Sequence, residues 1–190
     1  MPTALTTIVN LYDTLKILFS KGMGTRLEVL RFNRPSNKQL DTYEKYALEF
    51  FECVHASFPE VRDYLDAAPS NVDGSALRSA SGGHLLFRPI GLEIIAENYC
   101  HLKKSRVLSQ SEITSLLSSL PSQLSEAPYR GLVWNPRKES INTKGKGVAK
   151  RVVGYMLGSD TDEATLLADY RKALEGVEKP EEMKLPEKVA

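Results

Sequence analysis

The sequence predicts a mainly α fold, organised as a single compact helical domain of about six helices with at most one or two short strands. Three observations lead to this prediction. Apolar residues recur at three- and four-residue steps through most of the chain, the spacing of one helix face. Two Ser-x-x-Gln/Glu pairs have the spacing of helix capping boxes. An apolar share of 42% in 190 residues supports a core without disulfide bonds.

The first half of the chain contains the clearest helical patterns and one candidate strand. The first helix ends near Gly22 and Gly24, and its apolar stripe is Leu5, Ile8, Tyr12, Leu15 and Phe19. Loose alternation over residues 27–32 indicates a strand. The pair Ser36 and Gln39 opens a second helix, whose expected buried face is Leu40, Tyr43, Ala47, Phe50 and Val54. A short helical turn begins at Pro59.

Residues 66–83 are rich in Ser, Gly and Asn and predict a long loop. A helix follows from Pro89, and the pair Ser109 and Glu112 caps the next one. Residues 129–136 resemble an extended stretch packed on the core. Two helices remain, one after Gly145 and Gly147 and one capped by Ser159-Asp160.

These patterns predict how the chain is divided. We expect a helical domain over residues 1–158, a C-terminal helix over 159–176 and a flexible charged tail over 177–190. In that tail, Pro180 and Pro186 stand among Glu and Lys residues.

Composition favours a cytoplasmic protein with no membrane partner. The formal net charge is +1, so no global charge steers the chain towards nucleic acid. Cys53 and Cys100 fit reduced, buried thiols. Neither a signal peptide nor a run of about 18 apolar residues is evident. The three histidines lack metal-ligand spacing, and no cofactor motif occurs, so we expect no metal and no cofactor. Glu93 and Glu97, one helical turn apart, indicate a solvated face.

A first candidate anion site lies where the long loop meets a helix, and it comprises Arg78, Gly82, Gly83, His84 and Arg88. Glycines allow close backbone approach, a helix N-terminus offers N–H donors to an anion, and arginine adds a forked charged donor. The structural alternative, which we favour, is a tight turn with Arg88 paired to a carboxylate across the interior.

A second candidate site is a basic stretch, offset only by Glu139, with the single tryptophan nearby: Trp134, Arg137, Lys138, Lys144, Lys146, Lys150 and Arg151. Such a patch would follow a phosphate backbone, with Trp134 as a stacking platform. The alternative is a solvated loop around a helix start, and the near-zero net charge favours it.

Four segments occur in the order found in one protein family: TTIVNLY from Thr6, GGHLLFRPIG from Gly82, LVWNP from Leu132 and GYML from Gly154. Together they resemble the C-terminal helical part of DGQHR-domain proteins, the DndB-like group associated with DNA modification. The resemblance spans residues 4–158. It implies a setting in bacterial DNA modification, its regulation or phage defence.

One departure from that family limits what the resemblance implies. The Asp-Gly-Gln-His-Arg signature is absent, and in the family it belongs to an N-terminal ParB-like portion. The chain would then correspond to the C-terminal half alone, as a fragment or as one product of a split gene whose partner supplies the missing half. Any nucleotide-linked activity of that portion does not carry over.

Three functions are therefore open. The first is a non-catalytic accessory or regulatory module of a DNA-modification or defence system, binding DNA or a partner subunit. The second is a protein–protein interaction domain without nucleic-acid contact, which a large exposed apolar patch would favour. The third is an enzyme on a phosphorylated small molecule, with His84 as acid–base and Arg78 and Arg88 as anion clamps. The absence of a recognisable catalytic set ranks the enzyme last.

Overall fold

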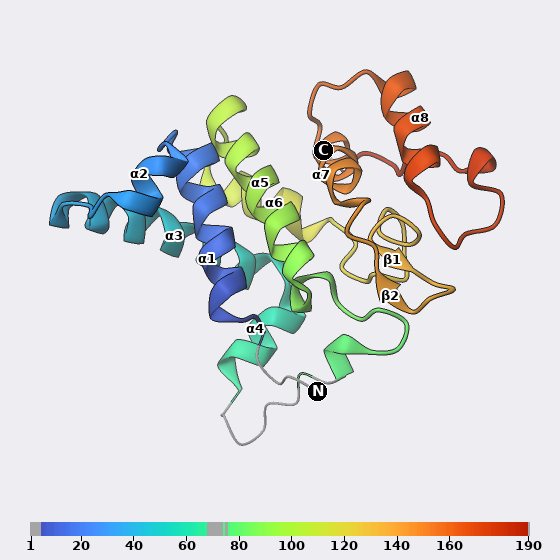
Figure 1. Cartoon of the computed structure of the whole chain (residues 1–190), viewed down its shortest axis with the longest axis horizontal. Coiled ribbons are helices and arrows are strands. Elements are labelled where there is room, and N and C mark those ends of the chain that lie inside the picture. The colour runs from blue at the N-terminus through green and yellow to red at the C-terminus, as the bar shows by residue number, and fades with distance from the viewer. Residues whose placement is uncertain (1–4, 68–73, 75, 190) are drawn as a thin grey trace.

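Helix α5 (Pro89–Ser105) lies at the centre of the molecule, between α1 (Ile8–Ile17) on one side and α7 (Lys146–Met156) on the other (Figure 1). It buries ten of its residues, among them Leu92, Ile94 and Ile95. A helix buried on most of its circumference needs neighbours all round, and α6 (Gln110–Ser118) and the π-helical turn η1 (Leu18–Gly22) provide two more.

The structure, a computed structural model, describes residues 5–67, 74 and 76–189. The mainly α prediction is confirmed, because these residues form eight α-helices and only a two-stranded antiparallel sheet. The remaining helices are α2 (Leu27–Phe32), α3 (Asn37–Ser57), α4 (Pro59–Asp66) and α8 (Glu163–Ala173). The short 3-10 helices are η3 (Ala76–Arg78), η4 (Leu85–Phe87) and η5 (Pro180–Glu182).

Both predicted capping boxes are confirmed. Ser36 and Gln39 cap α3, and Ser109 and Glu112 cap α6, each with reciprocal side-chain-to-backbone hydrogen bonds. Each pair satisfies N–H groups that have no partner inside the helix. The start of α5 at Pro89 is also as predicted, because proline has no N–H to leave unsatisfied there.

The prediction of a strand over residues 27–32 is wrong, because this segment is helix α2. Its backbone bonds are local, with Leu30 N–H donating to Arg26 O and Asn33 N–H to Val29 O. The only described sheet pairs β1 (Trp134–Asn135) with β2 (Ser140–Ile141), in the register Trp134 to Ile141. The extended stretch expected over residues 129–136 is therefore strand only at its end, after a series of turns.

Two other predicted details differ. Asp162, not Ser159-Asp160, caps α8, and its carboxylate accepts from the N–H groups of Ala164 and Thr165. On α1 the apolar stripe is only partly buried, since Ile8 is 83% exposed. The helix packs on α5 along the face that carries Thr14, so no described element covers the face with Ile8.

Two further expectations concern the cysteines and the C-terminus. Cys53 and Cys100 are buried free thiols, as predicted. The expected flexible tail makes contacts along its described part, because Val189 N–H donates to Met156 O and Met183 O accepts from Arg171 Nε. Met183 and Leu185 pack on the core. Flexibility of this segment stays a prediction, and residue 190 lies outside the described residues, as do 68–73 and 75 of the predicted loop.

Candidate functional site

The first predicted anion site is a set of contacts that hold the backbone in place. Arg88 donates from Nε and Nη2 to the carbonyl oxygen of Gly82, at 3.2 and 3.0 Å, and its guanidinium lies over the Trp134 ring. Arg78 donates to Phe87 O at 3.0 Å and to Leu5 O at 3.2 Å. The tight turn of the structural alternative is present, but the partner of Arg88 is a backbone carbonyl oxygen and not a carboxylate.

His84 lies within the core. Its exposed fraction is 0%, and its Nδ1 accepts from the Leu86 N–H at 3.1 Å as the cap of η4. Nε2 has no hydrogen-bond partner among the described residues and lies 3.7 Å from Glu60 Oε2. Burial lowers the pKa of His84, and the Glu60 carboxylate opposes this effect. A ring enclosed in this way does not present a proton to a substrate, which argues against the enzyme hypothesis.

At Gly82 and Gly83 the turn leaves no room for a side chain. Gly83 has φ +77°, and a Cβ there would stand 2.2 Å from the carbonyl oxygen of Leu77. Gly82 has φ +107° and lies against Leu124 and Trp134. Both glycines therefore serve the fold of the turn, because only glycine accepts this geometry readily.

The second predicted site is divided by ion pairs. Lys146 pairs with Glu93 at 2.8 Å, Lys150 with Glu97 at 2.5 Å, and Arg151 with Asp169 at 2.7 Å. The expectation that Glu93 and Glu97 form a solvated face is wrong, because both bridge from α5 to α7. Arg137, Lys138 and Lys144 form no side-chain bond within the described residues.

Trp134 cannot serve as a stacking platform. Its side chain is 4% exposed, since its ring packs under Arg88 and beside Gly82. That part of the nucleic-acid prediction is wrong, because a base needs an open ring face on which to stack.

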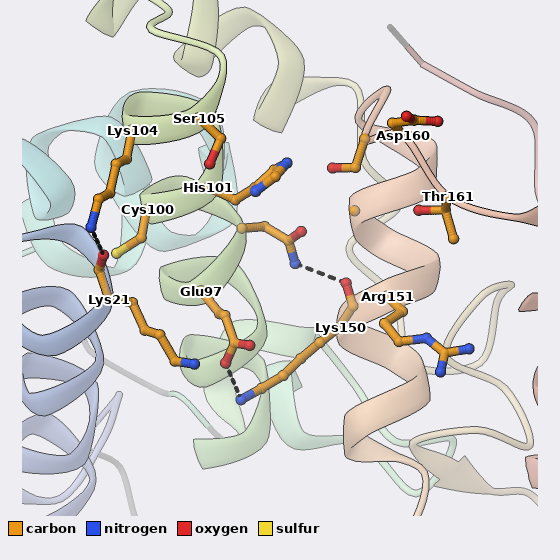
Figure 2. Close-up of a pocket in the computed structure, with 13 residues that line it drawn as sticks. Lys21, Glu97, Cys100, His101, Lys104, Ser105, Lys150, Arg151, Asp160 and Thr161 are labelled. Carbon is orange, nitrogen blue, oxygen red and sulfur yellow. Dashed lines mark hydrogen bonds and ion pairs between the residues drawn. The ribbon is translucent and has the colours of Figure 1, made fainter. Parts of the chain in front are cut away.

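A groove crosses the exposed side of α5, and its volume is about 510 Å³. Figure 2 shows α5 as its floor, with Lys21 and Lys104 on one side and α7 with Arg151 on the other. Asp160 and Thr161, from the loop between α7 and α8, also line the groove on the α7 side. We call this groove the α5–α7 cavity. Of the predicted residues, only Lys150 and Arg151 line it.

A second feature that sequence reasoning missed lies at the other end of the molecule, where α2 joins α3 (Figure 1). Helix α2 buries none of its residues. Phe32 is 81% exposed, Leu40 47% and Leu27 42%. We call this segment the α2 surface, and its residues are Arg26, Leu27, Arg31, Phe32, Arg34, Lys38 and Leu40.

The four cations of the α2 surface are exposed, and none of them forms an ion pair with a described residue. Between residues 26 and 40 the only carboxylate is Glu28. A sequence signal existed, since four basic residues and only one acidic residue alternate with apolar residues over this segment. The prediction of a strand over residues 27–32 did not reveal this exposed surface, because residues 27–32 form a helix.

The described part of the chain contains no cluster of three or more side chains suited to a metal ion. None of its helices is both long and apolar enough to cross a bilayer. No protein-family model, curated protein or solved structure matches this chain. The resemblance to DGQHR-domain proteins therefore remains a proposal.

Proposed function

We propose that this chain is a non-catalytic interaction module that binds an acidic protein partner through the α2 surface. The observation that carries the proposal is the combination, within residues 26–40, of exposed apolar side chains with cations that have no carboxylate partner among the described residues. Burying a side chain as exposed as Phe32 releases apolar surface from water, at about 25 cal/mol for each Å².

The residue types favour a protein as the partner. Interface cores are enriched in aromatic residues and arginine, and lysine is depleted from them. Three of the four cations on the α2 surface are arginines, whose guanidinium matches a carboxylate with two parallel hydrogen bonds. Leu27 and Leu40 offer aliphatic contacts, which phosphate groups do not use. An acidic segment with apolar side chains would satisfy both kinds of residue.

The resemblance suggests where such a partner acts. In a DNA-modification or phage-defence system, the chain would be the accessory or regulatory subunit, and the partner would carry the Asp-Gly-Gln-His-Arg signature that this chain lacks. The buried His84 and the backbone-bound Arg78 and Arg88 support a non-catalytic role.

Site-specific photo-crosslinking tests the proposal in the cells that express the full chain. A photoreactive phenylalanine analogue replaces Phe32 in one experiment and Val107 in the other. Val107 is a matched control, because it is also 81% exposed but lies beyond the end of α5. We expect a protein adduct at position 32 that position 107 does not give. Adducts only with lipid, nucleic acid or a second copy of the chain contradict the proposal.

Affinity measurements on the purified pair then test the chemistry. Phe32→Ser should weaken binding at least 10-fold, and Arg31→Glu with Arg34→Glu should do so more strongly at low salt than at high salt. Lys172→Glu on α8, which is exposed and has no ion-pair partner among the described residues, is the control and should change little. Equal losses for the control and for the α2 variants would argue against the α2 surface.

DNA contact is a second candidate, supported by a different observation. Arg137, Lys138 and Lys144 are exposed around the β1–β2 hairpin and carry no ion pair within the described residues. If they contact phosphates, changing all three to Ala should abolish a low-salt gel shift and reduce its salt dependence. The α2 variants should leave that shift intact, so the two functions can be separated.

A further inference from the structure

The α5–α7 cavity has no role in the proposed interaction, but its lining is that of a ligand site. Its volume of about 510 Å³ lies within the range of small-molecule sites, roughly 300–1,000 Å³. Three segments distant in sequence meet there: η1 with Lys21, the outer face of α5, and α7 with the loop that follows it (Figure 2).

Positive charge is in excess in this cavity. Its cations are Lys21, Lys104, Lys150 and Arg151, and its carboxylates are Glu97 and Asp160. Glu97 neutralises Lys150, and Asp169 from outside neutralises Arg151. Lys104 reaches only the carbonyl oxygen of Lys21, at 3.4 Å, and neither lysine has a carboxylate partner among the described residues. Two ammonium groups on one side are therefore available to an anion.

Two side-chain oxygens without a hydrogen-bond partner among the described residues belong to the α7 side of the cavity. Asn98 is 5% exposed, and its amide nitrogen donates to Ile94 O at 2.9 Å and to Lys150 O at 3.2 Å. Its Oδ1 accepts no hydrogen bond from the described residues, although the side chain lines the cavity. The buried Ser159 Oγ also has no partner among them. A buried oxygen such as Ser159 Oγ is costly to leave unsatisfied, so a hydroxyl or N–H group of a ligand would stabilise this wall.

A glycine leaves room for these polar atoms. Gly154 on α7 lines the cavity, and a Cβ there would stand 3.0 Å from Asn98 Oδ1 and 3.4 Å from Ser159 Oγ. Alanine is the better helix former, by about 1 kcal/mol, but the close approach of Asn98 and Ser159 favours glycine at this point of α7.

We propose that the α5–α7 cavity binds a phosphorylated small molecule of mononucleotide size, with its phosphate at Lys21 and Lys104 and a hydrogen-bond donor at Asn98 Oδ1. This binding is independent of the α2 surface, which lies at the junction of α2 and α3. Phosphate is the anion we favour because its several oxygens accept charge-assisted hydrogen bonds from ammonium groups.

Calorimetric titration of the full chain tests the proposal with three probes: AMP, adenosine without the phosphate, and inorganic phosphate without the nucleoside. We expect AMP to bind with a Kd below about 1 mM and each of the other two to bind at least 10-fold more weakly. The double variant Lys21→Met with Lys104→Met should lose at least 10-fold in AMP affinity. Lys172→Met, an exposed lysine on α8, should bind as the unchanged chain does.

Gly154→Ala tests the polar wall separately. We expect a folded chain with a modestly lower thermal unfolding midpoint, because the added methyl group crowds Asn98 Oδ1, and an AMP affinity that is at least 10-fold lower. Absence of AMP binding at 10 mM, or binding that the lysine and glycine variants leave unchanged, would overturn the proposal. So would tighter binding of a 5′-phosphorylated DNA strand than of AMP at the same two lysines, since that would make nucleic acid the ligand.

Discussion

Glu97 on α5 and Lys150 on α7 form an ion pair of 2.5 Å, and the same two helices are joined one turn earlier by Glu93 and Lys146 at 2.8 Å. Each pair joins residues 53 positions apart, so α5 and α7 run parallel and in step. Asn98 adds a hydrogen bond to the backbone of α7 at Lys150. These contacts fix the separation of the two helices on which the cavity depends.

A double-mutant cycle measures that coupling. For Glu97→Gln and Lys150→Met we expect a coupling free energy of about 0.5–1 kcal/mol, because both side chains are partly exposed to solvent. Urea unfolding, followed by the fluorescence of the single tryptophan, gives the four stabilities. The coupling should decrease at high salt. Arg62 and Asp63, an exposed neighbouring pair, should give a coupling near zero, and equal values for the two pairs would contradict this interpretation.

The helices were predictable from the sequence because they depend on local signals. The capping pairs Ser36–Gln39 and Ser109–Glu112 satisfy backbone groups within a few residues, so the sequence contains all the information needed. Residues 27–32 could not be assigned in this way, because a six-residue apolar segment fits a strand or a helix equally well. What decides is the presence of a partner strand, which is a property of the tertiary structure.

The candidate sites depended on such tertiary contacts throughout. A run of basic residues does not predict which carboxylates lie opposite it. Glu93 and Glu97 are each 53 residues away in sequence from the lysines with which they pair. One signal was present in the sequence: Glu93 and Glu97 are four apart, as are Lys146 and Lys150, the spacing that two helix faces need to match. Nothing comparable marked Asn98 or Ser159, whose oxygens without a hydrogen-bond partner among the described residues become evident only from the structure.

Arg88 is expected to stabilise the fold and to bind no ligand. Arg88→Ala removes two hydrogen bonds to Gly82 O and the contact with the Trp134 ring. It should cost about 1–3 kcal/mol in the free energy of unfolding, and Arg88→Lys should recover only part, because lysine lacks the fork. Arg130→Ala is the control, since Arg130 is exposed and its side chain has no polar partner among the described residues. Unchanged stability in Arg88→Ala would instead indicate a ligand-binding arginine.

His84 should make the protein less stable as the pH falls below neutrality. Burial holds its pKa below the ordinary value of 6.5, so the unfolded chain takes up a proton that the folded chain resists. The stabilisation is complete above the unfolded pKa and is lost as the pH falls towards the folded one. The slope is at most about 1.4 kcal/mol for each pH unit. Urea unfolding at pH 7.5, 6.5 and 5.5 measures it.

The window from pH 7.5 to 5.5 isolates this effect from the capping carboxylates. The pKa values of Glu112 and Asp162 are both lowered by the hydrogen bonds that they accept, so these groups stay ionised there. His84→Asn keeps an acceptor for the Leu86 N–H and cannot titrate, so the slope should flatten. His101→Asn, on the surface of α5, should leave it as it was. A slope that persists in His84→Asn would assign the effect to another group.

Two glycines of the same sequence should respond to alanine in opposite directions, and Gly83 is the one that should lose stability. Gly83→Ala places a methyl group 2.2 Å from the Leu77 carbonyl oxygen and imposes φ +77° on a residue with a side chain. The backbone there cannot move freely, because Gly83 O accepts from Leu124 N–H and the neighbouring His84 N–H donates to Leu77 O. We expect a loss of more than about 2 kcal/mol in the free energy of unfolding.

Gly147 in α7 is the matched glycine that should gain. A Cβ added at this position would have no atom within 4 Å, so Gly147→Ala should stabilise the helix by up to about 1 kcal/mol. Thermal unfolding separates the two variants, since about 1 kcal/mol shifts the midpoint of a chain of this size by about 2–4 °C. If Gly83→Ala is tolerated, the turn before His84 can rearrange. That result would contradict the interpretation that Arg88 holds the Gly82 carbonyl in a fixed turn.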